Sequence, residues 1–199
     1  MDLKRIFALI PMLPLLLTGC TGIPATPGKT VNRMAGGFVS DVTVTTADSQ
    51  TRAVLTRYGT DAWEVCFCEP AALDGVELRF LDGEVTASYK GLEFSVPQSA
   101  QALRTEFAEL MHVVDSNAPL TELDTHTADE LFVSEGELEV GSYTLSFAQD
   151  GTPVQFSLPA YGVLITFDTF TDADGCAVTE TSTIPKTYPV TDVVTETST

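Results

Sequence analysis

Cys20 is the residue whose surroundings point most directly to chemistry. It follows Leu17, Thr18 and Gly19, so a thiol stands after one aliphatic and two small residues. A cysteine sulfur is nucleophilic enough to accept a diacylglyceryl group. The small side chains of Thr18 and Gly19 leave the peptide bond before Cys20 accessible to a peptidase. This spacing therefore predicts lipidation at Cys20 and cleavage between Gly19 and Cys20.

The residues before this cysteine have the composition of a secretion signal. Lys4 and Arg5 form a short basic region, and residues 6–17 form an apolar region that is too short to span about 30 Å of hydrocarbon. Together with the residues that lead up to Cys20, this is the pattern of a bacterial lipobox. We expect residues 1–19 to be a lipoprotein signal peptide. The alternative is an ordinary signal peptide that has a cysteine near its cleavage site.

Two acyl chains on Cys20 would hold the protein at the extracytoplasmic face of the bacterial cell membrane. Each buried methylene contributes about 0.8 kcal/mol, and one chain alone gives only reversible binding. The chain has 28 Asp and Glu against 10 Lys and Arg, which gives a net charge of −18. This charge argues against a nucleic-acid partner and against adsorption onto an anionic membrane. The expected membrane contact is therefore the diacylglyceryl group alone.

Three further cysteines could in principle form a disulfide or bind a metal. Cys66 and Cys68 lie two apart on an expected strand, where a disulfide between them would be strained. A bridge from either one to Cys176 is conceivable in an oxidising exterior, and inert thiols are the alternative. Zinc requires about four ligands, and no Cys-x₂-Cys pair or histidine cluster completes a set. We expect no metal site.

The sequence contains no recognisable catalytic motif. His112 and His126 have no evident nucleophile beside them, and the Gly-x-Ser-x-Gly, phosphate-loop and His-Glu-x-x-His patterns are absent from the sequence. An enzyme would need acids such as Glu64 or Glu93 to converge with His112. We therefore expect a protein without catalytic residues or cofactors.

The elements that must position these residues fall into a single domain. Residues 20–33 are rich in Pro and Gly and predict a flexible tether from the lipidated cysteine. Residues 34–170 carry nearly all of the apolar periodicity, and this segment is the expected domain. Residues 171–199 are dominated by Thr, Glu, Asp and Pro, which predicts a largely disordered tail.

Period two dominates the expected domain and indicates antiparallel strands. Asp82-Gly83 and Asp150-Gly151 suit tight hairpin turns. From Ala102 to Val114 the apolar residues follow a helical spacing instead, which predicts an amphipathic helix that packs on the apolar face of the sheet. The fold class is therefore α+β. Alternating apolar residues predict strands around 38–44, 63–67, 76–80, 85–89, 92–96, 143–147, 154–158 and 161–167.

Three segments between residues 63 and 96 resemble a known family. They are Trp63-Glu64-Val65, the run from Glu69-Pro70 through Leu73-Asp74-Gly75 to Leu78, and Tyr89-Lys90-Gly91-Leu92. The chain resembles small Gram-positive lipoproteins with a LolA-like, lipoprotein-carrier fold. This resemblance implies a strongly curved antiparallel sheet, an unclosed half-barrel, with one or two helices packed on its concave face. Relatives of this kind bind or carry lipids, or assist envelope processes through partner proteins.

These observations lead to two expectations for function. One helix is too narrow to cover so many strands, so the first is a hydrophobic ligand, a lipid or an acyl chain, in a cavity of the curved sheet. If the helix fills that cavity, the alternative is a surface-tethered interaction or scaffold protein for another cell-envelope protein. The expected cavity residues are Phe80, Tyr89, Phe94, Phe107, Met111 and Phe156.

Overall fold

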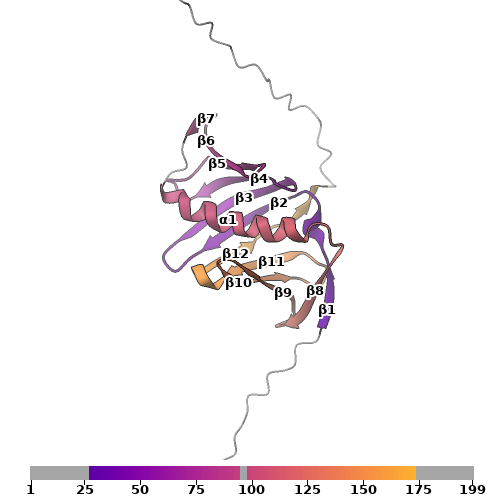
Figure 1. Ribbon diagram of the computed structural model, residues 1–199. Helices are drawn as coiled ribbons and strands as arrows, with labels where there is room; N and C mark the ends of the chain where they lie inside the picture. The colour runs from indigo at the N-terminus through magenta and orange to yellow at the C-terminus, as the bar shows by residue number, and fades with distance from the viewer. Residues whose placement is uncertain (1–26, 95–97, 174–199) are drawn as a thin grey trace, which may run out of the picture.

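The computed structural model of the protein describes residues 27–94 and 98–173, with helix side chains from Leu103 on. Within these residues the chain forms one antiparallel sheet of 13 strands, with one α-helix on its concave face (Figure 1). The strand order is β1-β8-β9-β10-β11-β12-β2-β3-β4-β5-β6-β7, and β13 pairs with β2. Strands β1 and β7 are the two open ends, so the predicted α+β fold with an unclosed, curved sheet is confirmed.

The elements follow one another along the chain with short connections. In the first half they are β1 (Pro27–Val31), η1 (Arg33–Ala35), β2 (Phe38–Thr45), β3 (Gln50–Gly59), β4 (Ala62–Glu69), β5 (Val76–Leu81), β6 (Glu84–Tyr89) and β7 (Leu92–Phe94). In the second half they are α1 (Gln98–Asn117), β8 (Glu122–Ala128), β9 (Leu131–Leu138), β10 (Gly141–Phe147), β11 (Pro153–Leu158), η2 (Pro159–Tyr161), β12 (Val163–Phe167) and β13 (Thr171–Asp172).

The strands form because apolar side chains alternate along them. In β2, β4, β5 and β12, every second residue is buried, which places one face on the core and the other toward solvent. Between β5 and β6, Asp82 and Gly83 both have positive φ, 51° and 81°. Two such residues in succession make a tight turn whose twist matches that of the flanking strands. The predicted hairpin is therefore present.

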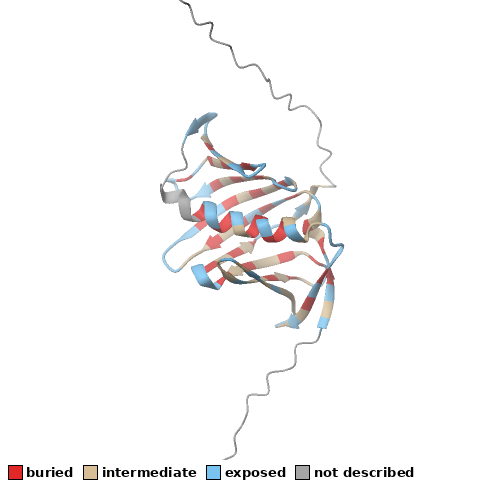
Figure 2. Ribbon diagram, viewed as in Figure 1, coloured by how far each residue is buried: buried red, intermediate tan, exposed pale blue. Residues whose placement is uncertain are grey.

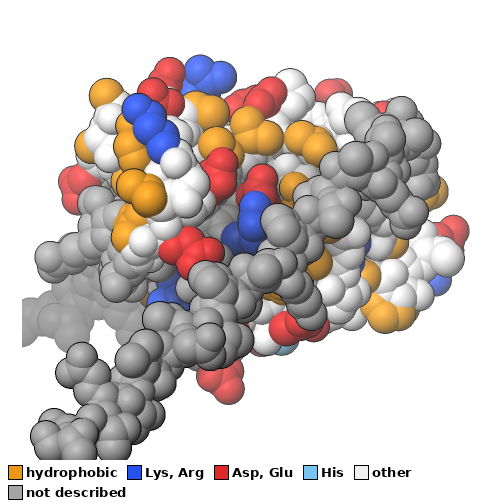
Figure 3. All heavy atoms as spheres, turned by 90° about the horizontal axis from the view of Figure 1, so that it is seen from above, with side chains coloured by type: hydrophobic (Ala, Val, Ile, Leu, Met, Phe, Trp, Pro, Cys, Tyr) orange, Lys and Arg blue, Asp and Glu red, His pale blue; other side chains and the backbone are white. Residues whose placement is uncertain are grey.

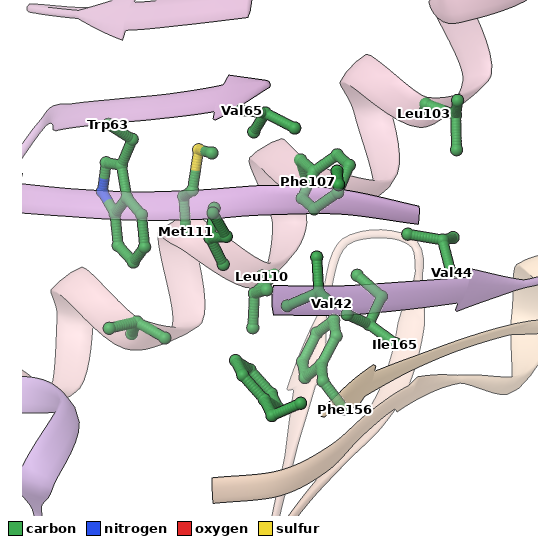
Figure 4. Close-up of a cluster of buried hydrophobic side chains, with 14 of the residues drawn as sticks. Val42, Val44, Trp63, Val65, Leu103, Phe107, Leu110, Met111, Phe156 and Ile165 are labelled. Carbon is green, nitrogen blue, oxygen red and sulfur yellow. The ribbon is translucent and has the colours of Figure 1, made fainter. Parts of the chain in front are cut away.

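The helix spans a longer stretch than the sequence predicts. Its first residue is Gln98 rather than Ala102, and it ends at Asn117. Figure 4 shows Phe107, Leu110 and Met111 pointing from α1 toward the strands, where they are buried. Buried residues form a continuous band along the helix and the middle strands in Figure 2. None of the helices in the described part of the chain is long and apolar enough to cross a bilayer.

A buried ion pair fixes the helix over the sheet. The Arg57 guanidinium on β3 donates from Nε and Nη2 to Asp115 Oδ1 on α1, at 3.1 and 2.9 Å. The other carboxylate oxygen of Asp115 accepts from Trp63 Nε1 at 2.9 Å and from the Asp61 backbone N–H at 3.0 Å. The side chains of Arg57 and Asp115 are only 2% and 12% exposed. A buried charged group is tolerated when it has an opposite charge and its remaining polar atoms form hydrogen bonds. Both oxygens of Asp115 accept such bonds here.

The N-terminal segment joins the same assembly. Arg57 Nη1 donates to the carbonyl oxygen of Ala35 in η1 at 2.9 Å. The buried Asn32 donates from Nδ2 to the carbonyl oxygens of Asn117 and Leu120, at 2.9 and 3.0 Å. Asn32 therefore ties the N-terminal segment to the end of α1 and to the turn that follows it, where the Asn117 carbonyl also accepts from the Leu120 N–H at 2.9 Å.

The domain boundaries differ from those that the sequence predicts. Residues 27–33 belong to the folded part rather than to the tether, because β1 pairs with β8 from Pro27 to Val31. At the other end, β13 pairs Thr171 with Val39 on β2. Apolar residues do not alternate clearly along β1, and Thr30 is the one buried residue in this strand. The strand is held in the sheet by its hydrogen-bonded pairing with β8. Residues 1–26 and 174–199, including Gly19, Cys20 and Cys176, lie outside the described residues.

Replacing Asp115 by Asn should destabilise the fold strongly. The substitution removes the charge that compensates the buried Arg57, and breaking such a pair costs about 3–5 kcal/mol. We expect a fall of that size in the free energy of unfolding by urea. Asp124→Asn is the control, because the Asp124 side chain is 93% exposed. A loss below about 1 kcal/mol, the size typical of an exposed pair, would contradict the assigned role.

Candidate functional site

One hollow remains open at the β7 end of the sheet. It has a volume of about 510 Å³, within the range of small-molecule sites, roughly 300–1,000 Å³. It lies between the β4–β5 connection and the hairpin of β6 and β7. The lining residues are Ala71, Ala72, Asp74, Val76, Tyr89, Leu92, Glu93 and Phe94.

Strand register explains why these apolar side chains meet. Val76 on β5 pairs with Tyr89 on β6, and Tyr89 pairs with Leu92 on β7. Residues paired across antiparallel strands lie on the same face of a sheet. Val76 is buried on the concave face, so the whole row lies there. Ala87 and Phe94 form the next row on that face. The hollow is thus the end of the apolar concave surface.

The helix does not shield this end of the sheet. Leu92 is 73% exposed, Tyr89 39% and Phe94 37%. Exposed apolar surface of this kind is unfavourable in water and marks a binding region when it is concave and contiguous. Figure 3, seen from the β7 end of the molecule, shows hydrophobic side chains gathered beside charged ones there.

The shape of the hollow depends on Gly75 and on the ring of Tyr89. Gly75 has φ +78°, and a Cβ at this position would lie 3.3 Å from Tyr89 Cε2. The ring therefore packs directly on the glycine backbone. On the same ring, Lys90 Nζ lies 5.0 Å from the centroid. The hollow is built from residues 70–76 and 89–94, so two of the segments that carry the family resemblance come together at it.

Two carboxylates lie among the apolar residues of the hollow. Asp74 comes from the β4–β5 connection and Glu93 from β7. Both residues are exposed. Neither forms an ion pair with any lysine or arginine in the described part of the chain. The lining is therefore apolar with a negative border.

The six residues that the sequence predicts to line one cavity are divided between the packed core and two separate hollows. Phe107 and Phe156 are fully buried, and Met111 and Phe80 are nearly so. The Phe107 ring lies 6.2 Å from the ring of Phe67 and fills the space between helix and sheet. Phe107 and Phe156 therefore belong to the packed core, whereas Phe80 and Met111 also line a second hollow of about 280 Å³ between α1 and the β5–β6 hairpin. The remaining two, Tyr89 and Phe94, line the hollow at the sheet end.

Sequence reasoning missed part of the hollow. Val76 and Leu92 fit the period-two pattern, but the pattern does not show that β7 ends the sheet and leaves Leu92 uncovered. Ala71 and Ala72 lie in a turn, where Leu73 N–H bonds to the Pro70 carbonyl at 2.8 Å. The sequence feature that indicates this site is the combination of the Tyr-x-Gly-Leu segment with residues 70–75, because both segments carry the family resemblance.

The other chemically suggestive residues do not converge. Cys66 and Cys68 are free thiols on the convex side of β4, and burial, followed by the negative charge of Glu77, raises the pKa of Cys66. Glu64 pairs with Arg79 at 2.9 Å, also on the convex side. The exposed His112 lies on α1 at the concave side, away from that pair. Among the described residues no three His, Cys, Asp or Glu side chains are placed to hold a metal.

The fold and the site define a class: an open, curved antiparallel sheet with one helix on its concave face and an apolar hollow at one end. No protein-family model matches the chain, and a search of curated proteins found no match. An uncharacterised conserved protein of Thermus thermophilus is similar in structure, with a TM-score of 0.41, 11% identity, and coverage of 70% of this chain and 80% of that one. A LolA superfamily protein of Nitrosomonas europaea has a TM-score of 0.34, 11% identity, and coverage of 69% and 86%.

Glu106 is a buried carboxyl that faces the core from α1. It is 7% exposed, and its Oε2 has no hydrogen-bond partner among the described residues. Burial raises the pKa of Glu106 above its ordinary value of 4.5. An acid whose pKa is raised by folding destabilises the folded state once the pH exceeds the ordinary value, because ionisation then opposes burial.

Replacing Glu106 by Gln should therefore stabilise the protein at neutral pH. We expect the free energy of unfolding at pH 7 to rise, because glutamine keeps the size of the side chain but cannot ionise, which removes the cost of charging a buried carboxyl. The gain should shrink as the pH falls toward 4.5 and disappear below it, where the wild-type carboxyl becomes protonated in both the folded and the unfolded state. Thermal unfolding between pH 4 and 8 measures this, with Glu109→Gln on the same helix as control. A gain that does not change with pH would contradict the assignment.

Proposed function

We propose that this protein is a lipid-anchored extracytoplasmic lipoprotein that binds a hydrophobic ligand, a lipid or an acyl chain, without catalysis. The site is the hollow formed by Val76, Tyr89, Leu92 and Phe94 at the end of the sheet. Its anchor is a diacylglyceryl group on Cys20. The observation that carries the proposal is an apolar cross-strand row on the concave face that stays open to solvent, with Leu92 73% exposed.

Burial of the exposed row supplies the driving force for binding. Covering a side chain such as Leu or Phe contributes about 1.5–3 kcal/mol. Three partly exposed side chains around a volume of about 510 Å³ therefore suffice for measurable affinity. The strands hold the row in place before binding, so little ordering is needed when the ligand enters.

A second candidate function uses the same end of the sheet. β7 has three residues and is the last strand of the sheet order, so its outer edge has no strand partner in the described residues. An edge of this kind can pair with an extended segment of another protein. In that case the protein is a surface-tethered scaffold for an envelope protein, and an apolar side chain of that partner occupies the hollow.

Leu92→Asp and Phe94→Asp should each weaken binding of an apolar ligand. We expect at least about tenfold weaker binding of dodecyl maltoside, used below its micellar concentration, because a charge then faces the buried chain. Native mass spectrometry and titration calorimetry measure the stoichiometry and the affinity. Leu120→Asp is the matched control, since Leu120 is 48% exposed and does not line the hollow. Equal weakening by the control, or absence of binding by the wild type, would reject the ligand site and favour the scaffold.

Cys20→Ser should abolish the membrane anchor. Cells fed labelled palmitate should incorporate label into the wild-type chain and none into the variant, and the variant should leave the membrane fraction. Cys68→Ser is the control, because Cys68 is an exposed thiol that the structure leaves free. Label retained by Cys20→Ser, or lost by Cys68→Ser, would show that Cys20 is not the lipidated residue.

A further inference from the structure

The geometry points to an amphiphile with a positively charged head group as the preferred occupant of the hollow. We propose that its apolar chain lies on the row of Val76, Tyr89 and Leu92, while an ammonium head group lies by Asp74 and Glu93. This inference rests on the proposed function and specifies the ligand class of the same site. It predicts that fatty acids and other anionic amphiphiles bind less well.

The first argument comes from the two carboxylates. Asp74 and Glu93 line the same hollow and approach it from separate elements, the β4–β5 connection and β7. Because neither forms an ion pair within the described residues, their charges remain available to a ligand. A cationic head group between them would gain from both, whereas an anionic one would be repelled by both.

The second argument comes from the aromatic ring beside them. Lys90 Nζ lies 5.0 Å from the centroid of the Tyr89 ring, which is within the distance of a cation–π interaction. The ring therefore already holds an intramolecular ammonium group, and a ligand ammonium must compete with Lys90 for it. Aromatic rings combined with carboxylates are well suited to ammonium groups, because the ring attracts the cation without requiring directed hydrogen bonds.

The third argument comes from the charge of the whole chain. The net charge of −18 gives a negative potential around the protein. That field draws cations toward the surface and repels anions, but it falls off within about 8–10 Å at ordinary salt. Selectivity that persists at ordinary salt must therefore come from groups at the hollow itself. These are Asp74 and Glu93, which Lys90 on the Tyr89 ring opposes in part.

Three amphiphiles that share a twelve-carbon chain test the inference. They are dodecyltrimethylammonium, dodecyl maltoside and dodecanoate, each titrated calorimetrically below its micellar concentration into the full chain at about 0.15 M salt. All samples carry Cys20→Ser, so that no acyl group competes. We expect the ammonium compound to bind about tenfold more tightly than dodecanoate. A difference of this size is what two exposed charge interactions contribute to an affinity. Dodecyl maltoside should lie between them.

Two double variants separate a local effect from the overall charge. D74N/E93Q should reduce the preference for the ammonium compound at least about threefold. D124N/E135Q makes the same change in net charge in β8 and β9, away from the hollow, and should leave the preference unchanged. Lys90→Ala should strengthen binding of the ammonium compound, because it removes the competing ammonium group from the ring.

The possible outcomes distinguish the two proposals. Equal affinity of the three compounds, or an equal effect of the two double variants, would overturn the charge selectivity and leave the apolar site standing. Failure of all three compounds to bind would overturn the proposed function and this inference with it. Tighter binding of dodecanoate than of the ammonium compound would reverse the assigned ligand class.

Discussion

The contact between Arg57 and Asp115 fixes the position of the helix, and the rest of the structure depends on that position. Each group is buried, so each is stable only while the other is in place. Trp63 and the backbone N–H of Asp61 donate further hydrogen bonds to the Asp115 carboxylate. The carbonyl of Ala35 accepts a further hydrogen bond from the Arg57 guanidinium. The network therefore joins α1, β3, β4 and the N-terminal segment at a single point. Apolar packing covers the sheet, but it is this directional contact that sets which part is covered.

A single helix leaves a large curved sheet incompletely covered. With side chains a helix is about 10–12 Å wide, whereas neighbouring strands lie about 4.8 Å apart. One helix can therefore cover only a few strands, even where the sheet curls around it. In Figure 1 α1 lies over the middle of the sheet, and β6 and β7 extend beyond it. The hollow at β7 stays uncovered because of this mismatch in width, while Gly75 and Tyr89 determine its shape.

Local features of the sequence predict the helix and eight of the 13 strands, and they miss β1, β3, β8, β9 and β13. They also do not reveal contacts between residues that are distant in sequence. Alternation predicts β2, β4 and β5 because their buried faces are apolar. It misses β3, where Thr51 and Arg57 lie on the buried face and break the apolar pattern. Arg57 and Asp115 are separated by 58 residues, so no local pattern relates them. For the same reason the sequence places Phe107 and Phe156 in a cavity, while the fixed helix packs them into the core.

The order of the strands also separates the end that would carry the proposed anchor from the end that holds the proposed ligand site. β1 and β7 are the opposite ends of the sheet order, and Figure 1 shows them at opposite ends of the domain. Residues 21–26 separate Cys20 from β1, and an extended chain advances about 3.3–3.6 Å per residue, so the proposed lipid would keep β1 within about 25 Å of the bilayer. Because the hollow belongs to β7, it lies at the end farther from that anchor. The anchor would then set the membrane at which the protein works, and the hollow would meet ligands presented from the other side.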